Sequence, residues 1–103
     1  GKRVGVIVND SFGRAWRLGT IGTAIGVAGL PALLDLRGRP DRTGRPLQTT
    51  ELGVADEAAA AASLLMGQAE EGRPIVHMRG FPYAMSEGRA ADLVRPPHMD
   101  LFR

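Results

Sequence analysis

A carboxylate and a hydroxyl stand side by side at Asp10-Ser11, soon after the β-branched run that starts at Arg3. Hard divalent cations such as Mg2+ and Mn2+ prefer oxygen ligands of this kind, and they usually add phosphate oxygens and water. Two arginines follow at Arg14 and Arg17, and a guanidinium group matches phosphate oxygens in pairs. The segment from Asp10 to Arg17 therefore predicts a site that handles phosphate with the help of a metal ion.

The same residues allow a purely structural interpretation. An aspartate and a serine after a strand are common in turns and helix caps. One Asp and one Ser do not complete an octahedral coordination shell, so the remaining ligands must come from elsewhere. The cation site and the simple turn both stay open at this point.

Several elements are expected to position this segment. The run Arg3 to Val8 predicts a buried strand, followed by a turn at Asp10 to Arg14. Glycines recur between Ile21 and Leu30, and because each glycine weakens a helix by about 1 kcal/mol, a strand is favoured there. Two further strands are predicted at Leu47 to Val54 and Pro74 to Met78.

The clearest helix runs from Asp56 to Gly67. Asp56 is predicted to cap its start, an alanine run fills its middle, and Gly67 is predicted to end it. Leu64 and Leu65 are expected to face the core. A short helix is predicted at Glu87 to Val94. This order of elements predicts an α+β fold, a mixed sheet with a few packed helices.

Composition limits the functional classes. A chain of 103 residues suits one domain, residues 1–103. The absence of cysteine excludes disulfides, thiolate nucleophiles and cysteine zinc sites. The weakly polar run from Ile21 to Leu34 is shorter than the ~20 residues that span a bilayer and is broken by glycines. We therefore expect a cytoplasmic protein that does not act in a membrane.

Charge argues against a nucleic-acid partner. The net charge is only +2, although 12 of the 13 basic residues are arginine. The arginine-rich loop from Arg37 to Arg45 keeps a small nucleic-acid binder as a third hypothesis, but it has no interleaved aromatic residues. The loop that follows the helix, Gln68 to Arg73, is able to hold a nucleotide through backbone amides, whereas composition alone favours a solvated loop.

A resemblance extends through most of the chain. The stretch Val6 to Gly19, V-I-V-N-D-S-F-G-R-A-W-R-L-G, resembles coenzyme F-420-0:L-glutamate ligase, the gamma-glutamyl ligase of coenzyme F-420 biosynthesis. The similarity continues at five further segments: Ala24 to Leu30, Leu33 to Gly38, Val54 to Glu57, Leu65 to Gly67, and Arg95 to Arg103. Several motifs in the same order are more specific than any one of them. The resemblance implies that the chain is the C-terminal portion of a larger, two-domain ligase fold.

The resemblance also implies an activity. Ligases of this family use GTP and Mn2+ or Mg2+, with K+ as a further ion, to join L-glutamate to coenzyme F-420-0 by an amide bond through an acyl phosphate. It implies a homodimer as well. A missing N-terminal part would supply further metal and nucleotide contacts, so the chain alone is expected to be inactive. The alternative is a non-catalytic binding or assembly domain that keeps the ligase fold.

Residue roles follow from the resemblance position by position. Asp10 matches a metal-binding aspartate, Ser11 a metal-binding threonine, and Gln68 a position where some members have a metal-binding glutamate. Arg14 and Arg17 lie within the motif and are expected to act in catalysis by contacting phosphate. A GTP-contacting loop of the family is matched by eight residues: Met66, Gly67, Gln68, Ala69, Glu70, Glu71, Gly72 and Arg73.

Overall fold

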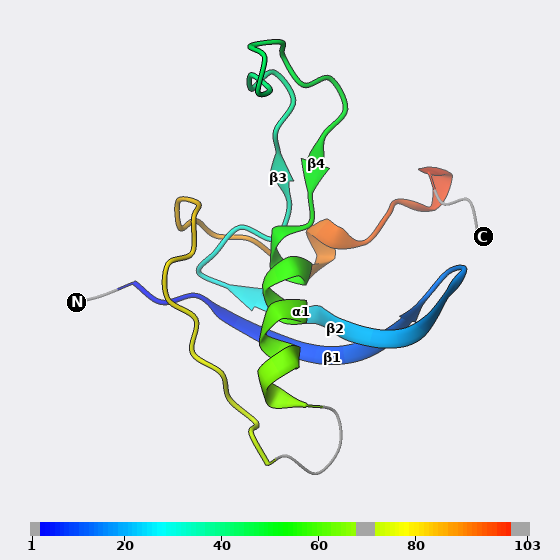
Figure 1. Cartoon of the computed structure of the whole chain (residues 1–103), viewed down its shortest axis with the longest axis vertical. Helices are drawn as coiled ribbons and strands as arrows, with labels where there is room; N and C mark the ends of the chain where they lie inside the picture. Colours follow the sequence, from blue (N-terminus) through cyan, green and yellow to red (C-terminus); the bar gives the residue numbers. More distant parts are fainter. Residues whose placement is uncertain (1–2, 68–71, 100–103) are drawn as a thin grey trace.

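The computed structural model describes residues 3–67 and 72–99. They form two antiparallel strand pairs and one α-helix, with two short 3-10 helices. The elements are β1 (Val6–Arg14), β2 (Arg17–Ala28), β3 (Leu34–Asp35), β4 (Glu51–Leu52), α1 (Val54–Met66) and the 3-10 helices η1 (Ala90–Leu93) and η2 (Pro97–Met99). Figure 1 shows α1 lying across the curved β1–β2 hairpin, with β3 and β4 at the base of an arm that extends away from it. The α+β class is confirmed.

The predicted mixed sheet is wrong, because β1 pairs only with β2 and β3 only with β4, both antiparallel. Two residues, Ala15 and Trp16, separate β1 from β2, and so short a connection permits only an antiparallel pair. The predicted turn at Asp10 to Arg14 is also wrong. β1 continues through it, and the chain reverses between Arg14 and its partner Arg17, with Trp16 at a φ of 58°.

A β-bulge in β2 sets which side chains face the helix. Val8 pairs with Gly26 and the next residue, Asn9, pairs with Ala24, so Ile25 is the extra residue. A bulge shifts the alternation of the strand by one position. Ala24 and Val27, three residues apart, therefore both pack in the core, while Ile25 is half exposed.

The helix prediction is largely confirmed. α1 ends at Met66, and Gly67 follows as its C-cap with a φ of 72°. At the start, however, Gly53 holds the N-cap position and Asp56 makes no capping bond. The Asp56 carboxylate instead accepts a hydrogen bond from the Ala24 backbone amide at 3.0 Å. Asp56 therefore ties the helix to the β2 bulge.

The core is built from small residues. Ala24, Ala32, Ala55 and Ala59 form its buried cluster. Leu64 and Leu65, expected to face this core, are 86% and 58% exposed instead. Residues four apart share a helix face, and the face that meets the hairpin is the one carrying Ala55 and Ala59.

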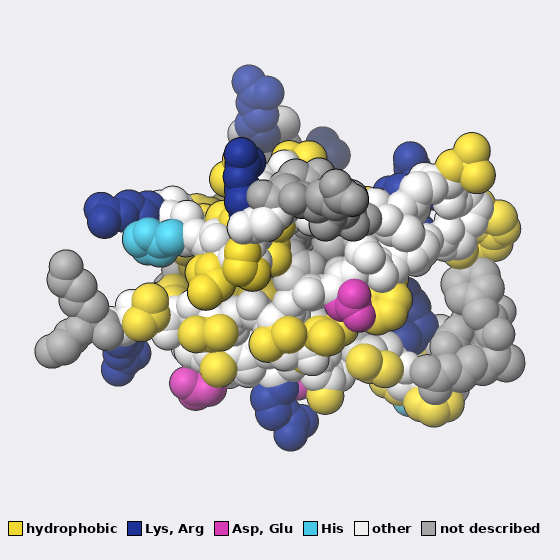
Figure 2. Space-filling view, turned by 90° about the horizontal axis from the view of Figure 1, so that it is seen from below, with side chains coloured by type: hydrophobic (Ala, Val, Ile, Leu, Met, Phe, Trp, Pro, Cys, Tyr) yellow, Lys and Arg dark blue, Asp and Glu magenta, His cyan; other side chains and the backbone are white. Residues whose placement is uncertain are grey.

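The hairpin is covered on one side only. Ile7 packs against the core cluster, whereas Val6, Val8 and Phe12 are 59%, 54% and 46% exposed. The expectation of a fully buried first strand is therefore wrong, since the described residues place no element over its outer face. Figure 2 shows hydrophobic side chains in a row across the lower face of the molecule.

Two predicted elements near the C-terminus differ from the structure. The segment Pro74 to Met78 has no regular secondary structure, because no strand of the described residues pairs with it. The helix expected at Glu87 to Val94 is reduced to the single 3-10 turn η1. Among the described helices, none has both the length and the apolar character needed to cross a membrane.

The arm contains an ion pair that predicts a pH effect. The Arg37 guanidinium contacts the Asp35 carboxylate at 2.7 Å and, with the Arg37 backbone amide, lowers the pKa of Asp35 from 3.8 to about 2. A lowered pKa means that the pair stabilises the folded arm above pH 4 and is lost as the pH falls toward 2. We expect the Asp35 carboxyl carbon to titrate near pH 2 by NMR, and Arg37→Ala to return that midpoint toward 3.8. An unchanged midpoint in the variant would contradict the assignment of the shift to Arg37.

Candidate functional site

A cavity of about 170 Å³ lies between β1, β2 and the C-terminal end of α1. β1 contributes Asn9, Asp10 and Ser11 to its lining. The rest of the lining comes from Gly22, Ser63, Met66 and Gly67. The structure thus brings the predicted metal-binding pair, Asp10 and Ser11, close to Met66 and Gly67, the first two residues of the predicted GTP-contacting loop. More than fifty positions in the sequence separate the two pairs.

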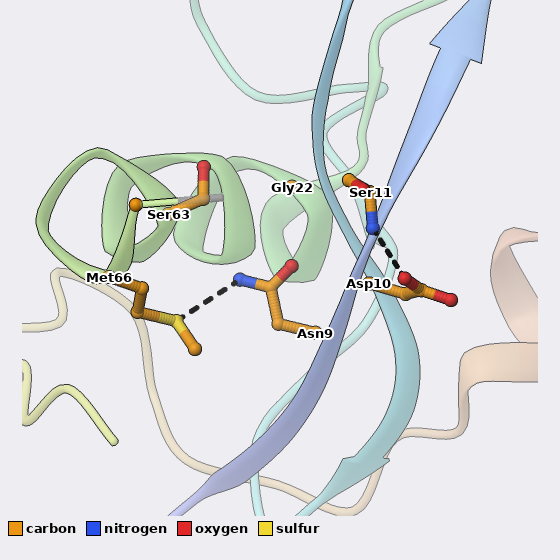
Figure 3. Close-up of a pocket in the computed structure, with 7 residues that line it drawn as sticks. Asn9, Asp10, Ser11, Gly22, Ser63 and Met66 are labelled. Carbon is orange, nitrogen blue, oxygen red and sulfur yellow. Dashed lines mark hydrogen bonds between the residues drawn. The ribbon is translucent and has the colours of Figure 1, made fainter. Parts of the chain in front are cut away.

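Successive side chains of β1 point to opposite sides of the strand, as strand geometry requires. Figure 3 shows Asn9 directed toward Met66 and Asp10 directed to the other side of β1. The Asp10 carboxylate accepts a hydrogen bond from the backbone amide of Ser11 at 2.8 Å. Because the side chains of Asp10 and Ser11 also alternate, one ion cannot take both of them while β1 keeps this geometry.

The electrostatics of the cavity favour a cation. Asp10 is the one charged residue in the described lining, although its side chain lies on the opposite side of β1 from Asn9 and Met66 (Figure 3), and no described basic side chain forms an ion pair with it. Met66 and Gly67 mark the C-terminal end of α1, and the last turn of that helix has no basic residue. Helix C-termini carry partial negative charge, which stabilises cations, and the Arg73 guanidinium already occupies part of this end through its hydrogen bond to the Leu65 carbonyl.

The two predicted catalytic arginines lie away from the cavity. Arg14 and Arg17 face each other at the end of the hairpin, and neither lines the cavity. The guanidinium of Arg14 donates a hydrogen bond to the backbone carbonyl of Leu18 at 3.2 Å. Their role in contacting phosphate therefore stays a prediction that the cavity itself does not support.

The predicted GTP-contacting loop is placed only in part. Met66 and Gly67 line the cavity, whereas Gly72 and Arg73 do not. Arg73 donates a hydrogen bond to the Leu65 carbonyl at 3.3 Å. The four remaining members lie outside the described residues: Gln68, Ala69, Glu70 and Glu71.

The donor set suits one kind of metal site. The described residues contain no cluster of three or more His, Cys, Asp or Glu side chains able to hold an ion. Asp10 and Ser11 therefore do not make a closed structural site. The Asp10 carboxylate by itself suits a hard, partly hydrated divalent cation that would take its other ligands from phosphate, water and residues beyond those described.

Three lining residues were not identified from the sequence: Asn9, Gly22 and Ser63. The period of two along β1 offered one signal, because it puts the polar Asn9 on the same face as the core residue Ile7. Gly22 and Ser63 carried no comparable signal, since glycine and serine are common in loops and helices alike.

An acidic strand residue beside a glycine-ended helix C-terminus suits a cation-dependent site for a phosphorylated ligand. Comparison with known proteins identifies the family. The F420-0:Gamma-glutamyl ligase family matches residues 1–80, and the chain belongs to this family.

Curated relatives match the chain along its whole length. Coenzyme F420:L-glutamate ligase of Methanococcus maripaludis is 52% identical over 103 residues, covering 100% of this chain and 42% of the relative. The protein of the same name from Methanocaldococcus jannaschii is 50% identical, and that from Archaeoglobus fulgidus 47% identical. The chain spans 41% of each of these two relatives. The expectation of a fragment-sized match is confirmed, while its placement in the C-terminal portion stays a prediction.

Proposed function

We propose that this chain is part of a ligase that adds L-glutamate to coenzyme F-420-0 with GTP and Mn2+ or Mg2+. One structural observation supports the proposal beyond family membership. Asp10 and Ser11 line the same cavity as Met66 and Gly67, where the predicted GTP-contacting loop begins. A nucleotide phosphate at the negative end of α1 needs a cation with it, and Asp10, which forms no ion pair among the described residues, is the one acidic residue of the described lining that would hold that cation.

The proposed reaction has two steps. A carboxylate oxygen of coenzyme F-420-0 attacks the γ-phosphorus of GTP, and GDP leaves. The amine nitrogen of L-glutamate then attacks the resulting acyl carbon, loses a proton, and displaces phosphate as the amide bond forms. A divalent ion, when bound, would supply charge neutralisation at the phosphates. Asp10 would hold that ion, and Ser63, Met66 and Gly67 form the wall of the cavity on the side of α1.

A homodimer and a cytoplasmic location belong to the same proposal, as does K+ as a further ion. The exposed apolar side chains of β1 need a covering surface, which a second copy of the chain or the rest of a longer protein would supply. A non-catalytic binding or assembly domain is the second candidate. The 41% to 42% coverage of the relatives favours it for this polypeptide acting alone.

The proposal is tested by calorimetric titration of GDP into the 103-residue chain, once with Mn2+ and once with EDTA. We expect heat of binding with Mn2+ and none with EDTA. Binding that is equal in both conditions would contradict metal-dependent nucleotide binding. An absence of binding in both conditions would show that this chain alone has no working nucleotide site, and the non-catalytic assembly domain would then be the remaining candidate.

A further inference from the structure

Asn9 is the lining residue whose side chain joins the most elements. Its amide nitrogen donates a hydrogen bond to the Ala59 carbonyl of α1 at 2.7 Å and lies 3.9 Å from the sulfur of Met66. Its amide oxygen accepts a hydrogen bond from the Thr23 amide of β2 at 3.1 Å. One side chain of β1 therefore connects β2, the middle of α1 and the last turn of α1.

Apolar packing holds the two halves of α1 unequally. The buried residues of the helix are Val54, Ala55 and Ala59, all in its N-terminal half. Leu64 and Leu65, in the last two turns, are mostly exposed. Hydrophobic burial thus holds the N-terminal half of α1 against the hairpin. It contributes much less to holding the C-terminal end of α1, which borders the cavity.

We propose that Asn9 is a positioning residue that sets the width of the cavity between β1 and the C-terminal end of α1. It directly precedes Asp10 in β1, and its amide reaches across to Met66, which lines the opposite wall (Figure 3). Among the described hydrogen bonds, those of Asn9 are the ones that join β1 to α1, so the spacing between β1 and the helix end depends on this side chain together with the close packing of Gly22 against α1. The inference about binding rests on the proposed function, whereas the inference about the helix end does not.

A purely structural role for Asn9 is separable from this one. Asp56 braces the same β2 bulge from the helix side through the Ala24 amide at 3.0 Å, and it does not line the cavity. Asp56→Ala is therefore the matched control for Asn9→Ala, because each removes a side-chain acceptor from the bulge. Both variants are expected to lower the midpoint of thermal unfolding.

The first measurement compares Mn2+ affinity among the wild-type chain and the two variants. Substitution of a residue that orients a metal ligand typically weakens binding 10- to 100-fold. We expect about a tenfold weaker Mn2+ affinity in Asn9→Ala and an unchanged affinity in Asp56→Ala. Equal weakening in both variants would show that Asn9 acts only through stability and would overturn the proposal.

The second measurement does not depend on metal binding. The chain has four methionines, so methyl-labelled methionine gives four NMR signals. We expect the Met66 methyl order parameter to fall in Asn9→Ala and to stay unchanged in Asp56→Ala, with Met78 and Met85 as internal references. If the wild-type chain binds no Mn2+, the proposed function fails for this chain and the Met66 signal alone decides the role of Asn9. A Met66 methyl that Asn9→Ala leaves unchanged would overturn that role.

Discussion

Asp10→Ala is expected to weaken the binding of GDP with Mn2+ by roughly 100-fold or more, since loss of a ligand exceeds the effect of losing a residue that merely orients one. The physical reason is charge. Asp10 is the one acidic residue in the described lining of the cavity, and a hard divalent cation held there would lose its strongest oxygen ligand when that carboxylate is removed. Asp10→Asn keeps the shape of the side chain and should lose nearly as much affinity.

The fold should tolerate this substitution. Asp10 is exposed, and its hydrogen bond in the described structure goes to the amide of the next residue. The free energy of unfolding should therefore change by no more than about 0.5 kcal/mol. Unchanged thermal unfolding together with lost binding would assign the effect to the site and not to the fold.

Glu57→Ala provides the control for net charge. Glu57 is an exposed acid in the first turn of α1, at the end of the helix far from Met66 and Gly67. The substitution Glu57→Ala removes the same charge from the chain as Asp10→Ala does, and it leaves the residues that line the cavity unchanged. Calorimetric titration should show wild-type affinity in Glu57→Ala. Equal losses in Glu57→Ala and Asp10→Ala would mean that Mn2+ responds to overall charge, and the site at Asp10 would be wrong.

Local signals in the sequence were enough to predict α1 but not the length of β1. Alanine is the strongest helix former and glycine a common helix end, so the helix and its end at Gly67 could be predicted from composition. Asp10-Ser11 suggested a turn by the same local reasoning. The cross-strand pairs of Asp10 with Thr23 and of Ser11 with Gly22 override that preference, and such pairing depends on residues more than ten positions away.

The candidate site was predictable in part for the same reason. Motif resemblance selected Asp10, Ser11, Met66 and Gly67, and the fold brings these four together around one cavity. Asn9 was not selected, because its bond to Ala59 joins residues fifty positions apart. A contact of that kind is specified by how α1 packs on the hairpin; the period of two along β1 indicates which face Asn9 is on, but not the atom of α1 that it contacts.

Gly22→Ala should produce the largest loss of stability among single methyl additions to the hairpin. A Cβ placed on Gly22 would lie 2.6 Å from the Ala59 carbonyl oxygen and 2.7 Å from the Ser63 Cβ. Both neighbours belong to α1, so the helix must move away from β2. Overpacking of this kind costs about 1 to 3 kcal/mol, which for a domain of this size lowers the melting temperature by roughly 5 to 20 °C.

Gly13→Ala is the matched control in the same hairpin. A Cβ on Gly13 meets nothing within 4 Å, and its backbone does not require a positive φ. The same added methyl should therefore be neutral, or stabilise the chain by up to about 1 kcal/mol by restricting the unfolded state. Thermal unfolding followed by circular dichroism distinguishes the two variants. Equal melting temperatures would contradict the close approach of α1 to β2.

A second substitution tests which atom of α1 is responsible. Ser63→Ala removes the hydroxyl that would lie 2.8 Å from the new Cβ, but it leaves the Ser63 Cβ and the Ala59 carbonyl oxygen in place. The carbonyl belongs to the backbone, and no side-chain substitution removes it. The double variant Gly22→Ala with Ser63→Ala should therefore stay as unstable as Gly22→Ala within about 0.5 kcal/mol, allowing for non-additivity between neighbours. Recovery of wild-type stability would instead place the clash at the Ser63 hydroxyl and would leave room for β2 to carry a side chain beneath α1.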